Sequence, residues 1–254
     1  MTHIERKRRI LERLENEGGA RVDELADELG VTKVTIRSDV AELEKRGLAV
    51  RSRGVILLPE RTDLARNVTN TIHENVDAKN AIARKALELI DPNATLILDS
   101  GSTNAVLAQH LHDMELTVVT SSVPVILELA RDKNISLIVS GGVLRRPSMA
   151  MVGEFSRHLY EHIHADVAFL GATGYTVEHG PSSANLLEAE TKRAIIASAA
   201  TTCLLVDSSK LGNRQMAGIC GWDKISYMIT ETMDATVRSR LSELGVAVSL
   251  PDDE

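Results

Sequence analysis

Five short segments of this sequence combine glycine, small hydroxyl residues and carboxylates, and each directly follows an apolar run. They are Asp99-Ser100-Gly101-Ser102-Thr103, Thr120-Ser121-Ser122, Ser140-Gly141-Gly142, Gly171-Ala172-Thr173-Gly174 and Asp207-Ser208-Ser209-Lys210. Glycine lets the backbone approach a ligand closely, while hydroxyls and free N–H groups at a helix start favour an anion. The Lys210 ammonium adds positive charge, and Asp99, Asp207 and Glu188 offer carboxylates to sugar hydroxyls. One such loop alone indicates little more than a turn, but five together predict a crevice for a phosphorylated, hydroxyl-bearing ligand.

The elements that must position these segments alternate between strand and helix from Asp77 onward. The predicted strands are Thr95–Asp99, Leu116–Thr120, Ser136–Ser140, Val167–Gly171, Cys203–Asp207, Ser226–Thr230 and Val246–Ser249. The predicted helices are Lys79–Ile90, Thr103–His112, Pro124–Asp132, Phe155–His162, Ala189–Ala200 and Ala235–Leu244. Continuously apolar strands are typical of a sheet covered on both faces. The pattern predicts a doubly wound parallel α/β domain, in which ligands lie beyond the carboxyl ends of the strands.

A second constellation lies near the N-terminus, where three helices are predicted at Glu5–Glu17, Val22–Leu29 and from Thr32 to about Arg46. Gly30 ends the second helix and Thr32 caps the third, which is the layout of a helix-turn-helix. If Ile36 and its apolar neighbours face the core, the opposite face presents short hydroxyls and cations. These residues are Thr32, Lys33, Thr35, Arg37 and Ser38. Such side chains at a helix start suit entry into the major groove of DNA.

A two-stranded wing is predicted after Gly47, turning at Ser52-Arg53-Gly54. We expect Arg51 and Arg53 to contact backbone phosphates. A protein–protein module with solvated charges is the alternative interpretation, and the run Thr32 to Asp39 followed by a basic wing disfavours it.

The charge of the chain is unevenly distributed along its 254 residues, with a net value of −7. Residues 1–58 hold 12 of the 29 Lys and Arg and 11 of the 36 Asp and Glu, so they carry +1 and the remainder carries −8. We therefore predict a DNA-binding domain at 1–58, a polar linker at 59–76 and an effector-sensing domain at 77–254. Two cysteines, no secretory signal and no membrane-length apolar run indicate a cytoplasmic protein.

The N-terminal segment resembles the DeoR family of bacterial sugar-metabolism regulators. The resemblance rests on Arg9-Ile10, Val22-Asp23-Glu24-Leu25-Ala26, Leu29-Gly30-Val31-Thr32, Thr35-Ile36-Arg37, Asp39-Val40, Leu43-Glu44 and Gly47. Two departures from the family pattern concern DNA contacts. Ser38 stands where the family usually has a second Arg, and Arg53-Gly54-Val55-Ile56 replaces a His-Gly-Gly-Ala-like wing tip.

The C-terminal segment is similar to the sensor domain of the same family. It carries Asp-x-Gly-x-Thr, Thr-x-Ser, Gly-Gly, Gly-Ala-x-Gly, Glu-x-x-x-Lys/Arg and Asp-Ser-Ser-Lys-x-Gly in the family's order, so the resemblance covers residues 5–250. The family implies a fold akin to ribose-phosphate isomerases and CoA transferases. It also implies a phosphorylated sugar or polyol as effector, and usually repression.

Two other classes of protein stay open at this point. A sugar-phosphate isomerase could draw acid–base groups from Lys210, Asp207, Asp99 and Glu188, but no nucleophile or base with a fixed partner is evident. A structural DNA-associated protein would bind no metabolite. His158 and His162 share a helical face at i, i+4, which can hold zinc, yet a solvated helix end is the better account, and we expect neither metal nor cofactor.

We therefore expect a repressor of carbohydrate-utilisation genes that has no catalytic activity. Its predicted partners are double-stranded operator DNA and a sugar-phosphate effector, with no membrane. Because operators repeat their half-sites about one DNA turn or a multiple apart, we expect a homodimer or homotetramer.

Overall fold

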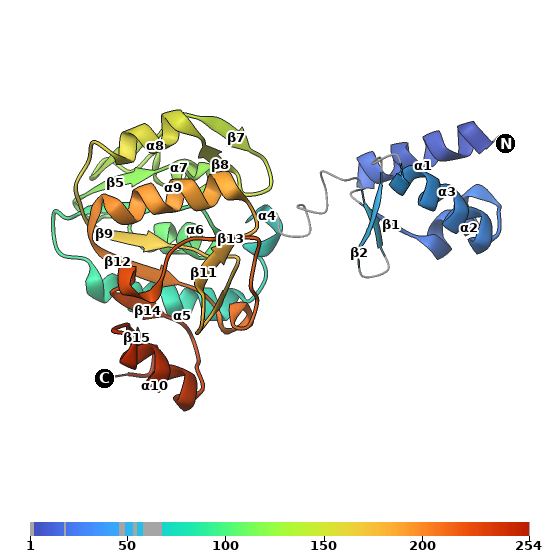
Figure 1. The fold of residues 1–254 in the computed structure, drawn as a ribbon. Coiled ribbons are helices and arrows are strands. Elements are labelled where there is room, and N and C mark those ends of the chain that lie inside the picture. Colours follow the sequence, from blue (N-terminus) through green and yellow to red (C-terminus); the bar gives the residue numbers. More distant parts are fainter. Residues whose placement is uncertain (1–2, 18, 46–48, 53–54, 58–67, 254) are drawn as a thin grey trace. The chain divides into compact units, whose positions relative to one another are not determined.

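In the computed structural model the chain divides into two units, Met1–Asn67 and Val68–Glu254. Residues 3–17, 19–45, 49–52, 55–57 and 68–253 are described (Figure 1). No helix in the described part of the chain is long and apolar enough to cross a membrane.

The N-terminal unit contains the three predicted helices, α1 (His3–Glu17), α2 (Val22–Leu29) and α3 (Lys33–Lys45). α2 ends because Gly30 adopts a left-handed conformation with φ 64°, and both its N–H and that of Val31 bond to the Ala26 carbonyl. Thr32 caps α3, since its Oγ1 accepts a hydrogen bond from the Thr35 N–H at 3.2 Å. The apolar stripes of the helices meet in one core, formed by Ile10, Leu14, Leu25, Ala26, Ile36, Val40 and Leu43, with Ala20, Ala49 and Ile56 from the segments around them.

The wing differs from the predicted two-stranded ribbon. β2 (Val50–Ser52) and β3 (Val55–Leu57) pair antiparallel as expected, but β1 (Ala20–Arg21) pairs with β3 and makes a three-stranded sheet. Two residues between a glycine pair and a helix give no recognisable strand pattern, so the sequence did not indicate β1. The predicted helix-turn-helix with a wing is confirmed.

The sensor unit is built on one seven-stranded parallel sheet in the order β15-β14-β12-β9-β4-β5-β6. The strands are β4 (Thr95–Leu98), β5 (Leu116–Thr120), β6 (Ile135–Val139), β9 (Ala165–Leu170), β12 (Ala199–Leu205), β14 (Tyr227–Ile229) and β15 (Ala247–Ser249). Each lies within two residues of a predicted strand at its carboxyl end. The sheet winds outward in two directions from β4 and β9, which are neighbours although about seventy residues separate them. The boundary between β4 and β9 is thus the topological switch point.

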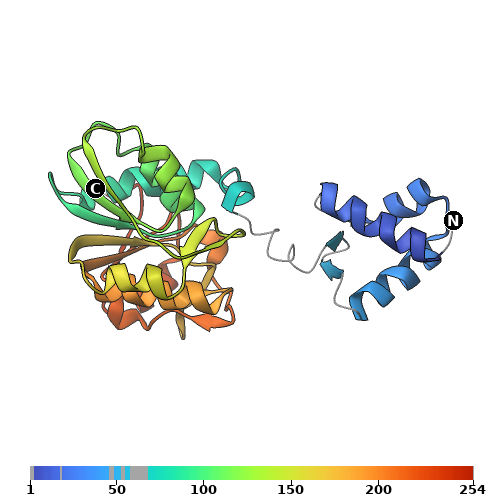
Figure 2. The same cartoon turned by 90° about the horizontal axis from the view of Figure 1, so that it is seen from above.

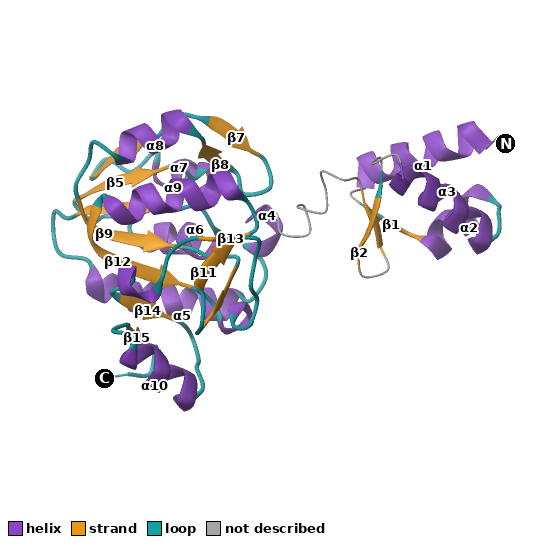
Figure 3. Ribbon diagram, viewed as in Figure 1, coloured by secondary structure: helices purple, strands orange, loops and turns teal. Residues whose placement is uncertain are grey.

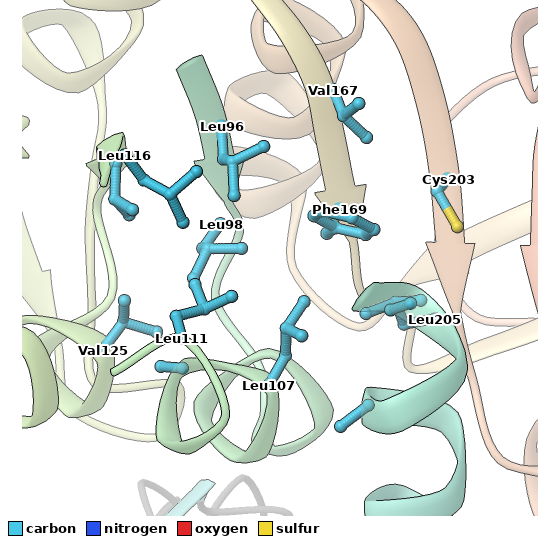
Figure 4. Close-up of a cluster of buried hydrophobic side chains, with 14 of the residues drawn as sticks. Leu96, Leu98, Leu107, Leu111, Leu116, Val125, Val167, Phe169, Cys203 and Leu205 are labelled. Atoms are coloured by element: carbon cyan, nitrogen blue, oxygen red, sulfur yellow. The ribbon is translucent and has the colours of Figure 1, made fainter. Parts of the chain in front are cut away.

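Helices cover both faces of this sheet, as Figures 2 and 3 show. They are α5 (Val76–Ala86), α6 (Ser102–Gln109), α7 (Val123–Leu129), α8 (Glu154–Tyr160), α9 (Leu186–Ala197) and α10 (Ala235–Glu243). Alternate residues of each strand enter different cores. Leu98, Phe169 and Leu205 pack against α5, α6 and α7 (Figure 4), whereas Ile97 and Leu204 pack on the opposite face. Burial on both faces explains why the strands are continuously apolar, and the doubly wound fold is confirmed.

Shorter elements lie between these main elements. An antiparallel hairpin is formed by β7 (Val143–Arg145) and β8 (Ala150–Val152). A small sheet contains β10 (Gly174–Thr176), β11 (Gly180–Ser183) and β13 (Ala217–Gly218). The unit begins with α4 (Val68–Thr71), within the stretch that the sequence assigned to the linker.

Replacing Leu107 of α6 by Ala should lower the free energy of unfolding of the sensor unit by about 2–5 kcal/mol, because a fully buried side chain leaves a cavity. Leu127 of α7 is 73% exposed, so the matched control Leu127→Ala should change that free energy by less than about 0.5 kcal/mol. The single tryptophan, Trp222, lies in this unit, and its fluorescence during urea unfolding measures both variants. Equal losses would contradict the packing described.

Candidate functional sites

The first turn of α3 presents the predicted DNA-reading side chains to solvent. Thr32, Lys33, Arg37 and Ser38 are exposed and Thr35 is half-buried, while Ile36 and Val40 face the core. The Thr32 and Thr35 hydroxyls are 2.9 Å apart at the start of the helix. Hydroxyls, an arginine and the positive end of a helix dipole therefore share one open surface.

Val34 is a member of this surface that the sequence analysis missed. Its side chain is 71% exposed, and its spacing from Arg37 and Ser38, i to i+3 and i+4, places the three on one face of α3. An exposed valine beside an arginine is suited to contact a thymine methyl while the guanidinium reads a base edge. The i, i+3 spacing of Val34 and Arg37 is the signal in the sequence that places Val34 on this face.

Arg51 has two partners within the N-terminal unit, and its predicted contact with a phosphate stays a prediction. Its Nη2 donates to the Arg37 carbonyl at 2.8 Å, and its Nε lies 3.4 Å from Glu44 Oε2. In this structure the side chain fastens β2 to α3. Arg53 lies outside the described residues.

Asp39 of α3 is 1% exposed and ties this helix to α1. Arg6 donates from Nη2 to Asp39 Oδ1 at 3.2 Å, and His3 Nε2 lies 2.7 Å from the same oxygen. The hydrogen bonds to Asp39 raise the pKa of the Arg6 guanidinium. This buried contact fixes the orientation of the reading face, because Asp39 is only two residues from Arg37.

Arg37→Ala should weaken binding to operator DNA by roughly 1–3 kcal/mol and relax base preference at one position. A guanidinium that reads a base contributes little on random DNA, so affinity for random duplex should change much less. Fluorescence anisotropy with operator and random duplexes at matched salt measures both. An equal loss on the two duplexes would assign Arg37 to a phosphate.

In the sensor unit, the switch point between β4 and β9 holds a buried polar cluster. Asp99, at the end of β4, is 1% exposed and accepts a hydrogen bond from the Gly171 N–H at 3.0 Å. Lys192 of α9, 4% exposed, forms an ion pair with the same carboxylate oxygen. Burial of a carboxylate is costly unless it is paired, so the ion pair with Lys192 offsets the cost of burying Asp99.

Asn104 of α6 completes this cluster. The residue is fully buried, and neither its amide nitrogen nor its amide oxygen has a hydrogen-bond partner among the described residues. A Cβ atom placed on Gly171 would lie 3.0 Å from the Ser100 carbonyl oxygen, 3.7 Å from Asn104 Nδ2 and 3.8 Å from Asp99 Oδ2. Glycine at 171 thus lets β9, Asp99 and Asn104 approach one another closely.

Two further predicted carboxylates already have partners, and they are Glu188 in the first turn of α9 and Asp207 after β12. Glu188 accepts from Ser183 Oγ at 2.9 Å and from Arg145 Nη1 at 3.1 Å. Asp207 accepts from Asn75 Nδ2 at 3.2 Å and lies 3.8 Å from the Lys210 ammonium. The predicted carboxylates are thus each held by at least one nitrogen donor.

The remaining predicted residues occupy varied environments. Thr120 is fully buried and donates to the Leu98 carbonyl at 2.6 Å, so its hydroxyl is engaged within the sheet rather than available to a ligand. Ser121 and Ser122 are buried beside β8, where the Met151 N–H donates to the Ser121 carbonyl at 2.9 Å. The others border the carboxyl edge of the sheet. Gly141 and Gly142 are exposed, Gly101, Ser102 and Thr173 are half-buried, and Ser100, Thr103 and Gly174 are buried.

The histidine pair at the end of α8 has a carboxylate neighbour, Glu161, although the sequence indicated no carboxylate with ligand spacing there. His158, Glu161 and His162 each offer one ligand atom within 4.8 Å of the others, and all three are exposed. Glu161 lies 3.2 Å from Arg157, and His162 Nδ1 is 2.8 Å from the His158 carbonyl. These contacts satisfy the cluster without an ion, and a solvated helix end remains our interpretation.

A winged helix-turn-helix joined to a doubly wound sensor with a polar switch point defines the class of ligand-controlled DNA-binding proteins. Comparison with known proteins identifies the family. The model for the DeoR C-terminal sensor domain matches residues 74–232, and the model for the DeoR-like helix-turn-helix domain matches residues 6–62. The chain belongs to the DeoR family of transcriptional regulators.

Relatives at full length support this assignment. The chain is 32% identical over 254 residues to the HTH-type transcriptional regulator GolR of Listeria innocua, covering 99% of this chain and 100% of that protein. It is also 32% identical to the putative aga operon transcriptional repressor of Escherichia coli O157:H7, covering 97% and 93% of the two chains. These relatives are regulators, and the chain is a DNA-binding regulator rather than an enzyme. The isomerase alternative is therefore set aside.

Among solved structures, the chain is similar to ribose 5-phosphate isomerase A from Methanocaldococcus jannaschii. The match covers 54% of this chain and 55% of that protein, with a TM-score of 0.41 and 18% identity.

Lys192→Met should destabilise the sensor unit by about 3–5 kcal/mol, because it leaves the Asp99 carboxylate buried without a cation. Adding Asp99→Asn should recover much of that loss, since the uncompensated charge is then gone. Urea unfolding followed by Trp222 fluorescence measures both variants. If the double variant is as unstable as the sum of its single changes, Asp99 and Lys192 are not coupled.

Proposed function

We propose that this regulator represses carbohydrate-utilisation genes, and that a phosphorylated sugar or polyol bound at the carboxyl edge of its sensor sheet lowers its affinity for operator DNA. The observation that carries the proposal is the buried, unpartnered amide of Asn104 beside Asp99 at the switch point. The relative named as an aga operon repressor supports repression.

Hydroxyl recognition is supported by the chemistry of this cluster. A buried amide without partners leaves both a donor and an acceptor unsatisfied, which costs roughly 1–3 kcal/mol per group. A ligand hydroxyl can donate to the Asn104 oxygen and accept from its nitrogen, so binding would remove that penalty. The Asp99 carboxylate, which is paired with Lys192, offers a second acceptor. Its Oδ2 lies 3.8 Å from the position that a Cβ atom on Gly171 would occupy.

Recognition of a phosphate is supported by the start of α6 and by nearby cations. Gly101 caps this eight-residue helix with φ 139° and without a side-chain hydrogen bond, so the first N–H groups of the helix have no side-chain acceptor at this cap. A helix start of this kind favours an anion. Lys210, in the loop after β12 and two strands from β4, is 30% exposed. The Arg145 guanidinium, held by Glu188, lies on the β7–β8 hairpin.

Four hydrogen bonds support a route from this edge to the segment that leads to the DNA-binding unit. The Val68 N–H donates to the Pro147 carbonyl at 2.9 Å, which attaches α4 to the β7–β8 hairpin. Asn75 donates to Asp207, and Lys79 donates to the carbonyls of Thr71 and Glu74. Burial lowers the pKa of the Lys79 ammonium, against the attraction of Asp207. A ligand that moved the hairpin or the Asp207 loop would thus move the first residues of the sensor.

The direct test titrates operator-bound protein with a panel of pentose, hexose and polyol phosphates, using the unphosphorylated compounds as matched controls. A phosphorylated compound should release the DNA, and the same compound should raise the melting temperature of the sensor unit. The Arg37→Ala variant should keep the thermal shift, because its change lies in the other unit. If no member of the panel alters DNA binding or melting, the proposed effector class is wrong.

Lys210→Met should weaken binding of that phosphorylated compound by about tenfold or more, because a charge-assisted hydrogen bond contributes roughly 1.5–3 kcal/mol. Lys224→Met is the matched control, since Lys224 is exposed and lies beside Asp223 on a different loop. Isothermal titration calorimetry measures both affinities, and operator affinity without ligand should be unchanged. Equal affinities of the two variants would remove Lys210 from the site.

A further inference from the structure

The two edge strands of the seven-stranded sheet differ in how far other parts of the chain cover them. At one edge, β15 is accompanied by α10 and the C-terminal residues. Arg238 of α10 donates to the Val248 carbonyl at 3.0 Å and pairs with Asp253 at 2.6 Å. At the other edge, β6 has no strand or helix paired along its outer side among the described residues. An uncovered edge strand offers a row of free backbone donors and acceptors to another chain.

Large apolar side chains surround this open edge. Ile138 and Val139 of β6 are 37% and 42% exposed, and Val143 and Leu144 of β7 are 70% and 47% exposed. Phe155 of α8 is 78% exposed, and its Cβ lies 4.0 Å from where a Gly141 side chain would begin. The strand end, the hairpin and α8 therefore adjoin, and Figure 1 shows β7, β8 and α8 at the same end of the sensor unit. We call Ile138, Val139, Val143, Leu144 and Phe155 the edge patch.

The edge patch is also free of charge in a chain that is otherwise acidic. Residues 135–144 read Ile-Ser-Leu-Ile-Val-Ser-Gly-Gly-Val-Leu, without a single ionisable side chain, whereas the chain carries −7 overall. Two copies that meet across residues 135–144 therefore bring no like charges of this segment together. A neutral apolar edge is self-complementary, which is the requirement for a two-fold interface between copies of one chain.

We propose that the edge patch is the surface through which two copies of this chain associate, with β6 pairing antiparallel to β6 of the second copy. Strand pairing would satisfy the free backbone groups, and the five side chains would form the apolar centre that interfaces require. The pairing would bring two reading helices into one particle, as repeated half-sites demand. It involves neither the effector nor the residues of the switch point.

The first experiment measures the mass of the full chain by sedimentation velocity at micromolar concentrations. The wild type should sediment at twice 27.6 kDa or a higher even multiple. Ile138→Lys and Val143→Asp should each raise the dissociation constant by at least about tenfold, because a two-fold axis brings the new like charges together. Leu244→Lys, a change at the opposite edge at a side chain 46% exposed, should not. A monomeric wild type, or charged variants that keep the wild-type mass, would overturn the proposal.

The second experiment does not depend on a destabilising change. Ser136→Cys is spin-labelled in a Cys220→Ser background, since the other cysteine, Cys203, is buried. Antiparallel pairing centred on β6 places the two Ser136 Cα atoms within roughly 20 Å at a rise of about 3.3 Å per residue. A pulsed dipolar measurement should find this short distance in the associated protein. Only longer distances would place the interface elsewhere. Neither experiment contains DNA or ligand. A negative result would therefore contradict the proposed interface without bearing on the proposed function.

Discussion

The buried ion pair between Asp99 and Lys192 is the interaction on which the arrangement of the sensor edge depends. Asp99 ends β4, Gly171 ends β9 and donates to the same carboxylate, and Lys192 reaches them from α9. A buried charge is tolerated only when its partners are fixed. This pair therefore joins the strands from which the sheet winds in opposite directions. Beside it, Asn104 keeps hydrogen-bonding capacity that no described residue uses.

Control of DNA binding requires that a ligand interact differently with two states of the protein. The contacts around the edge favour such a difference, because several of them are ion pairs that an anionic ligand can compete for. Arg145 is paired with Glu188, and Lys210 lies near Asp207. The same loops hold Asn75 and Val68, which lie at the start of the sensor unit. A phosphate that drew Arg145 or Lys210 toward itself would alter the support of the segment leading to the reader.

Much of this could be predicted from the sequence, and what could not has a physical reason. Apolar periodicity located the main strands and helices because both faces of the sheet are buried, and the strand-end residues followed from that topology. Lys192 belongs to the Glu-x-x-x-Lys/Arg piece of the family resemblance, but its ion pair with Asp99 could not be predicted, nor could the place of Asn104. Only the adjacency of β4, β9 and α9 brings these residues to Asp99. Thr120 was chosen by its position at a strand end, yet its hydroxyl bonds within the sheet. Very short strands such as β1 carry too few residues to show a pattern.

The proposed function requires a free-energy coupling between the sensor edge and the DNA-reading helix, and coupling of this kind must be reciprocal. The most direct measurement is calorimetric titration of the active sugar phosphate into the protein alone and into the protein saturated with operator DNA. The account predicts that operator weakens ligand binding by the same factor by which the ligand weakens operator binding. Equal ligand affinities with and without operator would contradict it.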